Sequence, residues 1–137
     1  MLFAWGLNVI ALCFGAALGA RALIDPKWAA RFVRLKADDQ GGGFAEFRAT
    51  YGGVFLGLHG AALLLALRYL LSGGALVGVI AAGASAALCA GWAGAAFGRF
   101  VAILRDKADT KFNRISCGVE LAIAVAIGMP WFVWALG

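Results

Sequence analysis

Residues 48–59 read RATYGGVFLGLH, and they open an apolar run that continues to Leu71. On an α-helix, Arg48 and His59 fall on one stripe, because they stand eleven residues, or about three turns, apart. Tyr51 flanks this polar stripe. The stretch therefore predicts a membrane helix that carries polar side chains on one side.

A second face of the same helix carries glycines. Gly53 and Gly57 fall opposite the polar stripe, with Gly-xxx-Gly spacing. Small residues let membrane helices approach closely, so this face predicts a helix contact. The same spacing predicts helix packing in two other apolar runs, at Gly15 and Gly19 and at Gly94 and Gly98.

The composition indicates an integral membrane protein. Of 137 residues, 64% are hydrophobic and only 14% are charged, whereas a soluble domain is nearer half apolar with about a quarter of its residues charged. Four apolar runs, at about residues 2–24, 47–71, 75–104 and 112–136, each reach the about 20 residues that a bilayer span needs. The sequence predicts one all-α domain, a four-transmembrane-helix bundle.

A short amphipathic helix is expected after the first span. Asp25-Pro26 ends the first helix, since proline disfavours a helical residue before it. In the basic segment that follows, Trp28, Phe32 and Leu35 share one helical face. We interpret this segment as an interfacial helix on the inner leaflet; a solvated basic loop is the alternative.

The basic residues predict the orientation of the chain. Eleven of its twelve Lys and Arg residues lie in or beside the first and third connections, and only Arg68 lies near the second. By the positive-inside rule both connections are cytoplasmic, and both termini are periplasmic in a bacterial cytoplasmic membrane. The net charge of +5 therefore reflects topology and does not indicate nucleic-acid binding.

Charged residues within the spans are the candidates for a site, because a charge inside a bilayer is costly. Arg99 lies six residues before Arg105, at the inner end of the third span, and Glu120 lies six residues after Arg114. At 1.5 Å per residue, both lie about 9 Å inside the interface. Because the two helices are consecutive and antiparallel, we predict an Arg99–Glu120 pair.

Arg48 and Tyr51 enter the second span at similar depth, and we expect them to join the pair. One interpretation of this cluster is a structural clasp between helices. A second is a pocket for an anionic or carbonyl-bearing ligand such as a quinone or a lipid headgroup, since a guanidinium suits either. A proton relay is the third, although only His59 continues the cluster into the membrane.

His59 is the single histidine of the chain and lies near the middle of the second span. A haem with two histidine ligands within this chain is therefore excluded. A hydrogen bond to a facing backbone or hydroxyl group is the plain interpretation, and a pigment or haem shared with a partner is the other. Asn8 is expected to form a hydrogen bond between helices.

Neither a metal site nor an enzyme is indicated by the motifs. The three cysteines lie far apart without metal-type spacing, at positions 13, 89 and 117. The sequence contains no Cys-x-x-Cys pair, phosphate-binding loop or nucleophile elbow. These absences favour a non-catalytic protein.

The motif Arg48-Ala49-Thr50-Tyr51-Gly52-Gly53 resembles the second span of a bacterial family of small four-helix inner-membrane proteins, a domain of unknown function similar to the DoxX-like group. Arg99 late in the third span and Glu120 early in the fourth extend the resemblance. DoxX-like relatives include membrane subunits of quinone-linked redox systems, so the resemblance implies that context. This chain lacks the redox cysteine pairs of some such systems, which argues against direct redox catalysis.

Two functions compete on these grounds. The first is an accessory or assembly subunit that packs on a larger membrane complex of respiratory or photosynthetic type. The expected protein partners are such a complex or further copies of this chain in a homo-oligomer. Its small size, short loops and several small-residue faces favour this function. The second is a stand-alone bundle that binds a quinone, lipid or other small amphiphile at the cluster of Arg48, Tyr51, Arg99 and Glu120.

Overall fold

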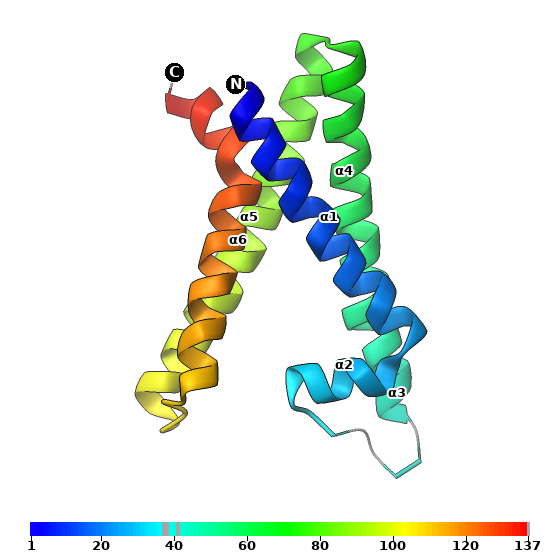
Figure 1. Cartoon of the computed structure of the whole chain (residues 1–137), viewed down its shortest axis with the longest axis vertical. Coiled ribbons are helices and arrows are strands. Elements are labelled where there is room, and N and C mark those ends of the chain that lie inside the picture. The colour runs from blue at the N-terminus through cyan, green and yellow to red at the C-terminus, as the bar shows by residue number, and fades with distance from the viewer. Residues whose placement is uncertain (37–38, 41, 137) are drawn as a thin grey trace. The chain divides into compact units, whose positions relative to one another are not determined.

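The computed structural model describes residues 1–36, 39–40 and 42–136, and over this range the chain is helical, with turns and short irregular segments but no strand. Its elements, shown in Figure 1, are α1 (Leu2–Ile24), α2 (Pro26–Val33), α3 (Gly42–Glu46), η1 (Phe47–Val54), α4 (Phe55–Ser72), α5 (Ala75–Arg105) and α6 (Lys111–Leu136). The helices α3, η1 and α4 follow one another without interruption. Four stretches are long and apolar enough to cross a membrane, namely α1, α3 through α4, α5 and α6. The predicted all-α fold with four spans is confirmed.

The chain forms two compact units. We call residues 1–11 together with 65–137 the hairpin unit, after its α5–α6 pair, and residues 12–64 the α2 unit, after the short helix that it contains. Helices α1 and α4 each contribute one part to each unit.

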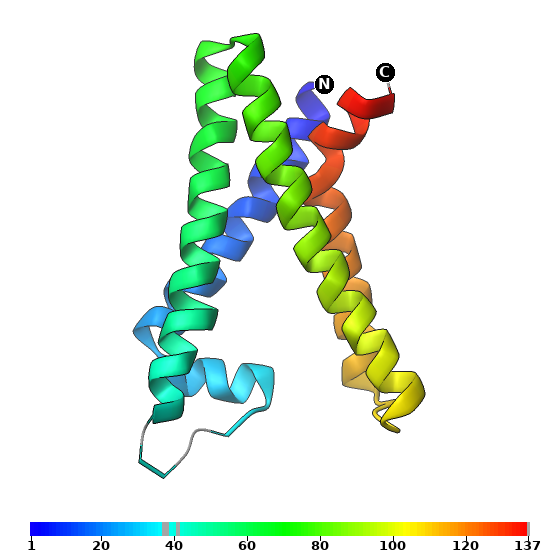
Figure 2. The ribbon, with the colours of Figure 1, turned by 180° about the vertical axis from the view of Figure 1, so that it is seen from behind.

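In the hairpin unit, α5 and α6 run antiparallel and pack side by side along their length, as both views show (Figures 1 and 2). A tight turn precedes α5, in which Gly73 and Gly74 have φ values of 68° and 96°. Glycine adopts positive φ values without the steric cost that a Cβ brings, so the two glycines allow the reversal. Across the turn, the Tyr69 ring lies against Gly78, where an added Cβ would be 2.7 Å from the ring Cε2.

Asn8 joins three helices of the hairpin unit. Its side-chain amide donates to the Ser85 hydroxyl of α5 at 2.9 Å and to the Ile127 carbonyl of α6 at 2.7 Å. The residue is fully buried, and Ser85 in turn donates to the Ala81 carbonyl at 2.9 Å. The predicted hydrogen bond between helices is confirmed. Because lipid offers no polar partner, these bonds hold the first turns of α1 against the hairpin.

In the α2 unit, the sequence around Asp25 defines the start of the short helix. The Asp25 side chain accepts a hydrogen bond from the Trp28 backbone N–H at 3.0 Å, and Pro26 occupies the first helical position. Both residue types are preferred at the start of a helix. The aspartate side chain accepts a hydrogen bond from a backbone N–H that has no partner within the helix, and proline has no backbone N–H that would need one. The helix ends at Arg34, whose φ is 62°.

Small residues of α2 are buried in the core of its unit, with the larger Trp28 and Val33 packed partly against that core. Ala29 and Ala30 are buried with Ala22 of α1 and Phe47 of η1, and Figure 1 shows α2 turned away from the direction of α1. The predicted short helix after the first span is therefore present. Phe32, half exposed, stacks on the Trp28 ring with 5.0 Å between centroids.

Candidate functional site

The motif that begins the second span adopts a π-helix, η1. The predicted stripe rests on 3.6 residues per turn throughout this span. The predicted start of the helix, at Phe44 or Ala45 just before the apolar run at residue 47, lies two to three residues after its observed start at Gly42. A π-helix has a wider turn and is rare, and short π-helical segments often mark functional positions. The wider turn changes which side chains of the motif share a face.

Arg48 of η1 binds the end of α1. Its guanidinium donates to the Leu23 carbonyl and also approaches the Ile24 carbonyl at 3.4 Å. The last carbonyls of a helix have no partner within the helix, and a basic side chain can satisfy them. One turn further, an added Cβ on Gly52 would lie 2.8 Å from the Leu23 Cα. Arg48 and Gly52 thus act together, the first as a cap and the second by allowing close approach.

His59 lies on the same side of the second span, at the contact with α1. It is 2% exposed, its Nδ1 is 2.8 Å from the Phe55 carbonyl of its own helix, and its ring stacks on the Phe55 ring. The facing residue is Gly15, where an added Cβ would be 2.7 Å from the His59 Cγ and closer still to other ring atoms. One turn along α1, Gly19 meets the backbone of Leu56.

These contacts correct one part of an expectation from the sequence. Gly53 and Gly57, opposite the polar stripe, were expected to pack closely either within the bundle or against a partner. Within the described α2 unit both are exposed, whereas a contact with a partner stays a prediction. An added Cβ on Gly57 would meet no atom within 4 Å, and one on Gly53 would meet only the Arg48 carbonyl, at 3.7 Å. Within the described α2 unit, the polar stripe itself is the packing face.

The glycines of the first run do pack closely, whereas those of α5 do not. Gly15 and Gly19 are buried against the second span, as predicted. Gly94 and Gly98 are exposed, and an added Cβ at either would meet no atom within 4 Å. Within the described hairpin unit, the expected helix contact at these two α5 glycines is therefore absent.

Arg99 and Glu120 form the predicted ion pair between α5 and α6. The Arg99 Nε donates to Glu120 Oε2 at 3.0 Å, and Nη2 donates to Oε1 at 2.6 Å. This two-bond geometry is the strongest that an arginine and a carboxylate form. The Glu120 side chain is 13% exposed and the Arg99 side chain is 30% exposed. Both charged groups are therefore partly buried between α5 and α6.

Asn113, which was not among the residues predicted from the sequence, completes this group. Its Oδ1 accepts from the remaining Arg99 Nη1 at 3.2 Å, while its Nδ2 donates to the Ala108 carbonyl at 2.7 Å. Asn113 stands seven residues, about two turns, before Glu120, so a search along that face of α6 would have found it. We call Arg99, Asn113 and Glu120 the α5–α6 clasp.

A second ion pair lies at the loop before α6. Arg114 donates to both carboxylate oxygens of Asp109, at 2.6 and 2.5 Å. The hydrogen bonds from Arg114 hold the pKa of the Asp109 carboxyl below its ordinary value. Because both groups are exposed, this pair contributes little to stability.

The clasp residues and the Arg48 motif belong to different units. Tyr51 lies in the α2 unit, partly buried against Phe47, Ala22, Ala29 and Ala30, with 5.6 Å between the Tyr51 and Phe47 rings. The expected cluster of Arg48 and Tyr51 with Arg99 and Glu120 stays a prediction. Among the described residues, no three His, Cys, Asp or Glu side chains lie together as metal ligands would.

In chemical terms, each arginine of the candidate site already donates to protein oxygen atoms. Arg48 donates to two backbone carbonyls, and Arg99 to a carboxylate and an amide oxygen. This arrangement ties helices together in both units. A comparison of the chain with protein-family models, curated proteins and solved structures finds no match.

Proposed function

We propose that this protein is a non-catalytic accessory or assembly subunit that packs on a larger complex in a bacterial cytoplasmic membrane, as in respiratory or photosynthetic complexes. One observation carries the proposal. A stripe of small residues on α5, which we call the α5 small face, is exposed along the helix: Gly83, Ala87, Gly91, Gly94 and Gly98.

The α5 small face lacks a partner within the described hairpin unit. An added Cβ at any of its four glycines would meet no atom within 4 Å. Glycine in a helix interior costs about 0.5–1 kcal/mol relative to alanine, so it is favourable mainly where another backbone approaches. Within a membrane, small residues on a helix allow the backbone of a neighbouring helix to approach closely. The occupant that fits this face is therefore a transmembrane helix of another protein.

The competing function, binding of a quinone, lipid or other amphiphile at Arg48, Tyr51, Arg99 and Glu120, has less support. A ligand would need donors from the two guanidinium groups. Both already donate to protein acceptors, and Glu120 accepts two bonds from Arg99. The clasp therefore favours a structural role for these residues.

Extraction of the tagged protein from its native membranes in a mild detergent tests the proposal. Native mass spectrometry should find a discrete assembly heavier than a monomer or homo-oligomer of this chain. Gly94→Leu should dissolve that assembly, because the leucine side chain would hold the partner helix away from the α5 backbone. The thermal unfolding midpoint of the variant should stay unchanged, since Gly94 has no neighbour in its unit.

Gly118→Leu is the matched control, because Gly118 of α6 is also exposed and without a close neighbour but lies outside the α5 small face. It should leave the assembly intact. A monomer that carries an extractable quinone or lipid would instead support the competing function. Loss of thermal stability in Gly94→Leu alone would show that the face is covered by this chain itself, and would contradict the proposal.

A further inference from the structure

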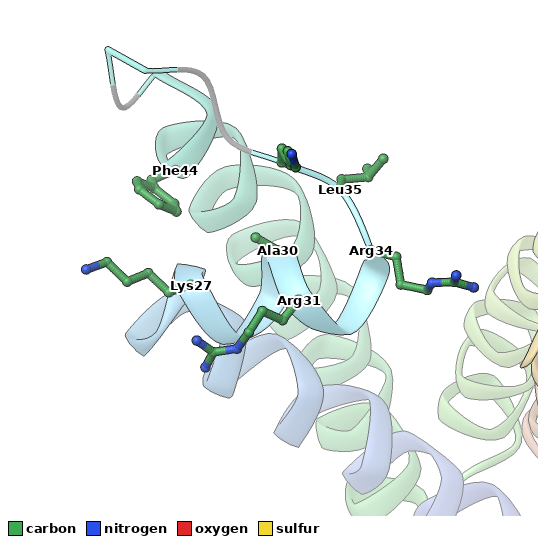
Figure 3. Close-up of a pocket in the computed structure, with 7 residues that line it drawn as sticks. Lys27, Ala30, Arg31, Arg34, Leu35 and Phe44 are labelled. Atoms are coloured by element: carbon green, nitrogen blue, oxygen red, sulfur yellow. The ribbon is translucent and has the colours of Figure 1, made fainter.

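A shallow groove of about 540 Å³ lies along α2 in the α2 unit. Of the seven described residues that line it, four are basic, namely Lys27, Arg31, Arg34 and Lys36, and none is acidic. Figure 3 shows Lys27 and Arg31 extending to one side of α2 and Arg34 extending from its end to the other side, with Phe44 contributed by α3. Leu35 and Phe44 add apolar surface. The groove thus combines a concentrated positive charge with an apolar wall.

The groove lies where two membrane-crossing stretches end. The first ends at Ile24 and the second begins at Gly42, so α2 connects them at one membrane surface. Phe32 and Leu35 are 51% and 55% exposed, and the Arg21 guanidinium lies 5.2 Å from the centroid of the Trp28 ring. Exposed apolar side chains beside basic ones are typical of a helix that lies at the level of the lipid headgroups.

We propose that this groove binds the headgroup phosphate of an anionic phospholipid. Arginine and lysine side chains are the usual protein donors to phosphate, and arginine can bind it through two parallel hydrogen bonds. Basic segments beside membrane spans gain about 1 kcal/mol per Lys or Arg from anionic lipids. The apolar wall of Leu35 and Phe44 matches the glycerol and upper acyl chains, which free phosphate lacks. The groove belongs to the α2 unit, whereas the α5 small face belongs to the hairpin unit.

Native mass spectrometry of the full chain in mild detergent tests this site by titration with dioleoyl phosphatidylglycerol or dioleoyl phosphatidylcholine. The wild type should bind the anionic lipid in preference. The double variant Lys27→Gln/Arg31→Gln should weaken its binding about ten- to thirty-fold, because two cations are removed. Binding of phosphatidylcholine should not change, and an excess of sodium phosphate should not displace the anionic lipid.

The matched control is Arg105→Gln/Lys111→Gln, which removes two exposed cations at the facing ends of α5 and α6. It should retain binding to within about two-fold. Lys36→Gln, which lies outside any helix, should weaken binding about five-fold and is a second variant that leaves α2 unaltered. Equal losses in both double variants, equal binding of both lipids by the wild type, or displacement by sodium phosphate would overturn the proposal.

Discussion

Glu120 is a carboxylate within a membrane-spanning helix, and its surroundings explain how it is accommodated. Both of its oxygens accept hydrogen bonds from Arg99, while Asn113 accepts from another guanidinium nitrogen. Asn113 is itself held by the Ala108 carbonyl, and its backbone N–H donates to the Thr110 hydroxyl at 3.2 Å. Contacts at the start of α6 therefore hold Asn113 in place, and its Oδ1 accepts the hydrogen bond that orients Arg99.

The clasp predicts non-additive effects of mutation. Arg99→Gln and Glu120→Gln should each lower the free energy of unfolding in detergent by about 2–3 kcal/mol, because each leaves one partly buried charge without its partner. The double variant should lose less than the sum of the two. A double-mutant cycle on the unfolding midpoints measures the coupling. Strict additivity would show that the two charges do not stabilise one another.

At the scale of elements, the contact of α1 with the second span depends on glycines. Gly15 accommodates the His59 ring, and Gly19 accommodates the backbone of Leu56. At the end of α1, Gly52 approaches the Leu23 backbone while Arg48 caps the helix. Arg48 and His59 therefore lie at the contact with α1, where the carbonyls at the end of α1 accept hydrogen bonds from Arg48 and Gly15 accommodates the His59 ring.

Alanine substitutions distinguish the packed glycines from the exposed ones. Gly19→Ala should destabilise the protein by about 1–3 kcal/mol, because the new methyl group meets backbone that cannot rotate away. Gly15→Ala should also destabilise, and His59→Ala should relieve part of that loss by removing the ring. Thermal unfolding in detergent, followed by circular dichroism, measures each change.

Gly57→Ala is the matched control for this series, since no atom lies near an added Cβ at that position. It should leave the unfolding midpoint unchanged or raise it slightly, because alanine is the better helix former. A destabilisation by Gly57→Ala equal to that by Gly19→Ala would refute the assignment of the packing face.

For the whole molecule, the distribution of charge predicts the orientation in the membrane. Eleven of twelve basic residues lie in or beside the connections α1–α3 and α5–α6. The α4–α5 turn carries no basic residue between Ser72 and Gly74. By the positive-inside rule, such an asymmetry predicts that the basic connections are cytoplasmic.

We therefore expect both termini in the periplasm. A C-terminal alkaline phosphatase fusion should be active, because that enzyme folds only in an oxidising compartment. A C-terminal fusion to a green fluorescent protein should be dark. An inactive phosphatase together with a fluorescent fusion would reverse the orientation.

Local properties of the sequence determined much of this protein. Run length and composition predicted all four spans, and Asp25-Pro26 with the basic segment after it predicted α2. The Arg99–Glu120 pair was predictable. In two consecutive antiparallel helices, residues that lie equally far from the connecting turn lie at the same depth. Each of these features follows from spacing along one helix or one hairpin.

The tertiary structure alone decided which faces pack. Glycine suits a helix contact, but lipid is as apolar as a leucine side chain, so hydrophobicity does not tell a lipid-facing stripe from a buried one. The π-helical turn at Phe47–Val54 changes the register that a 3.6-residue period assumes. For both reasons, the sequence alone did not assign Gly52 to the contact with Leu23 or Arg48 to the end of α1. Those roles depend on where a distant segment of the chain lies.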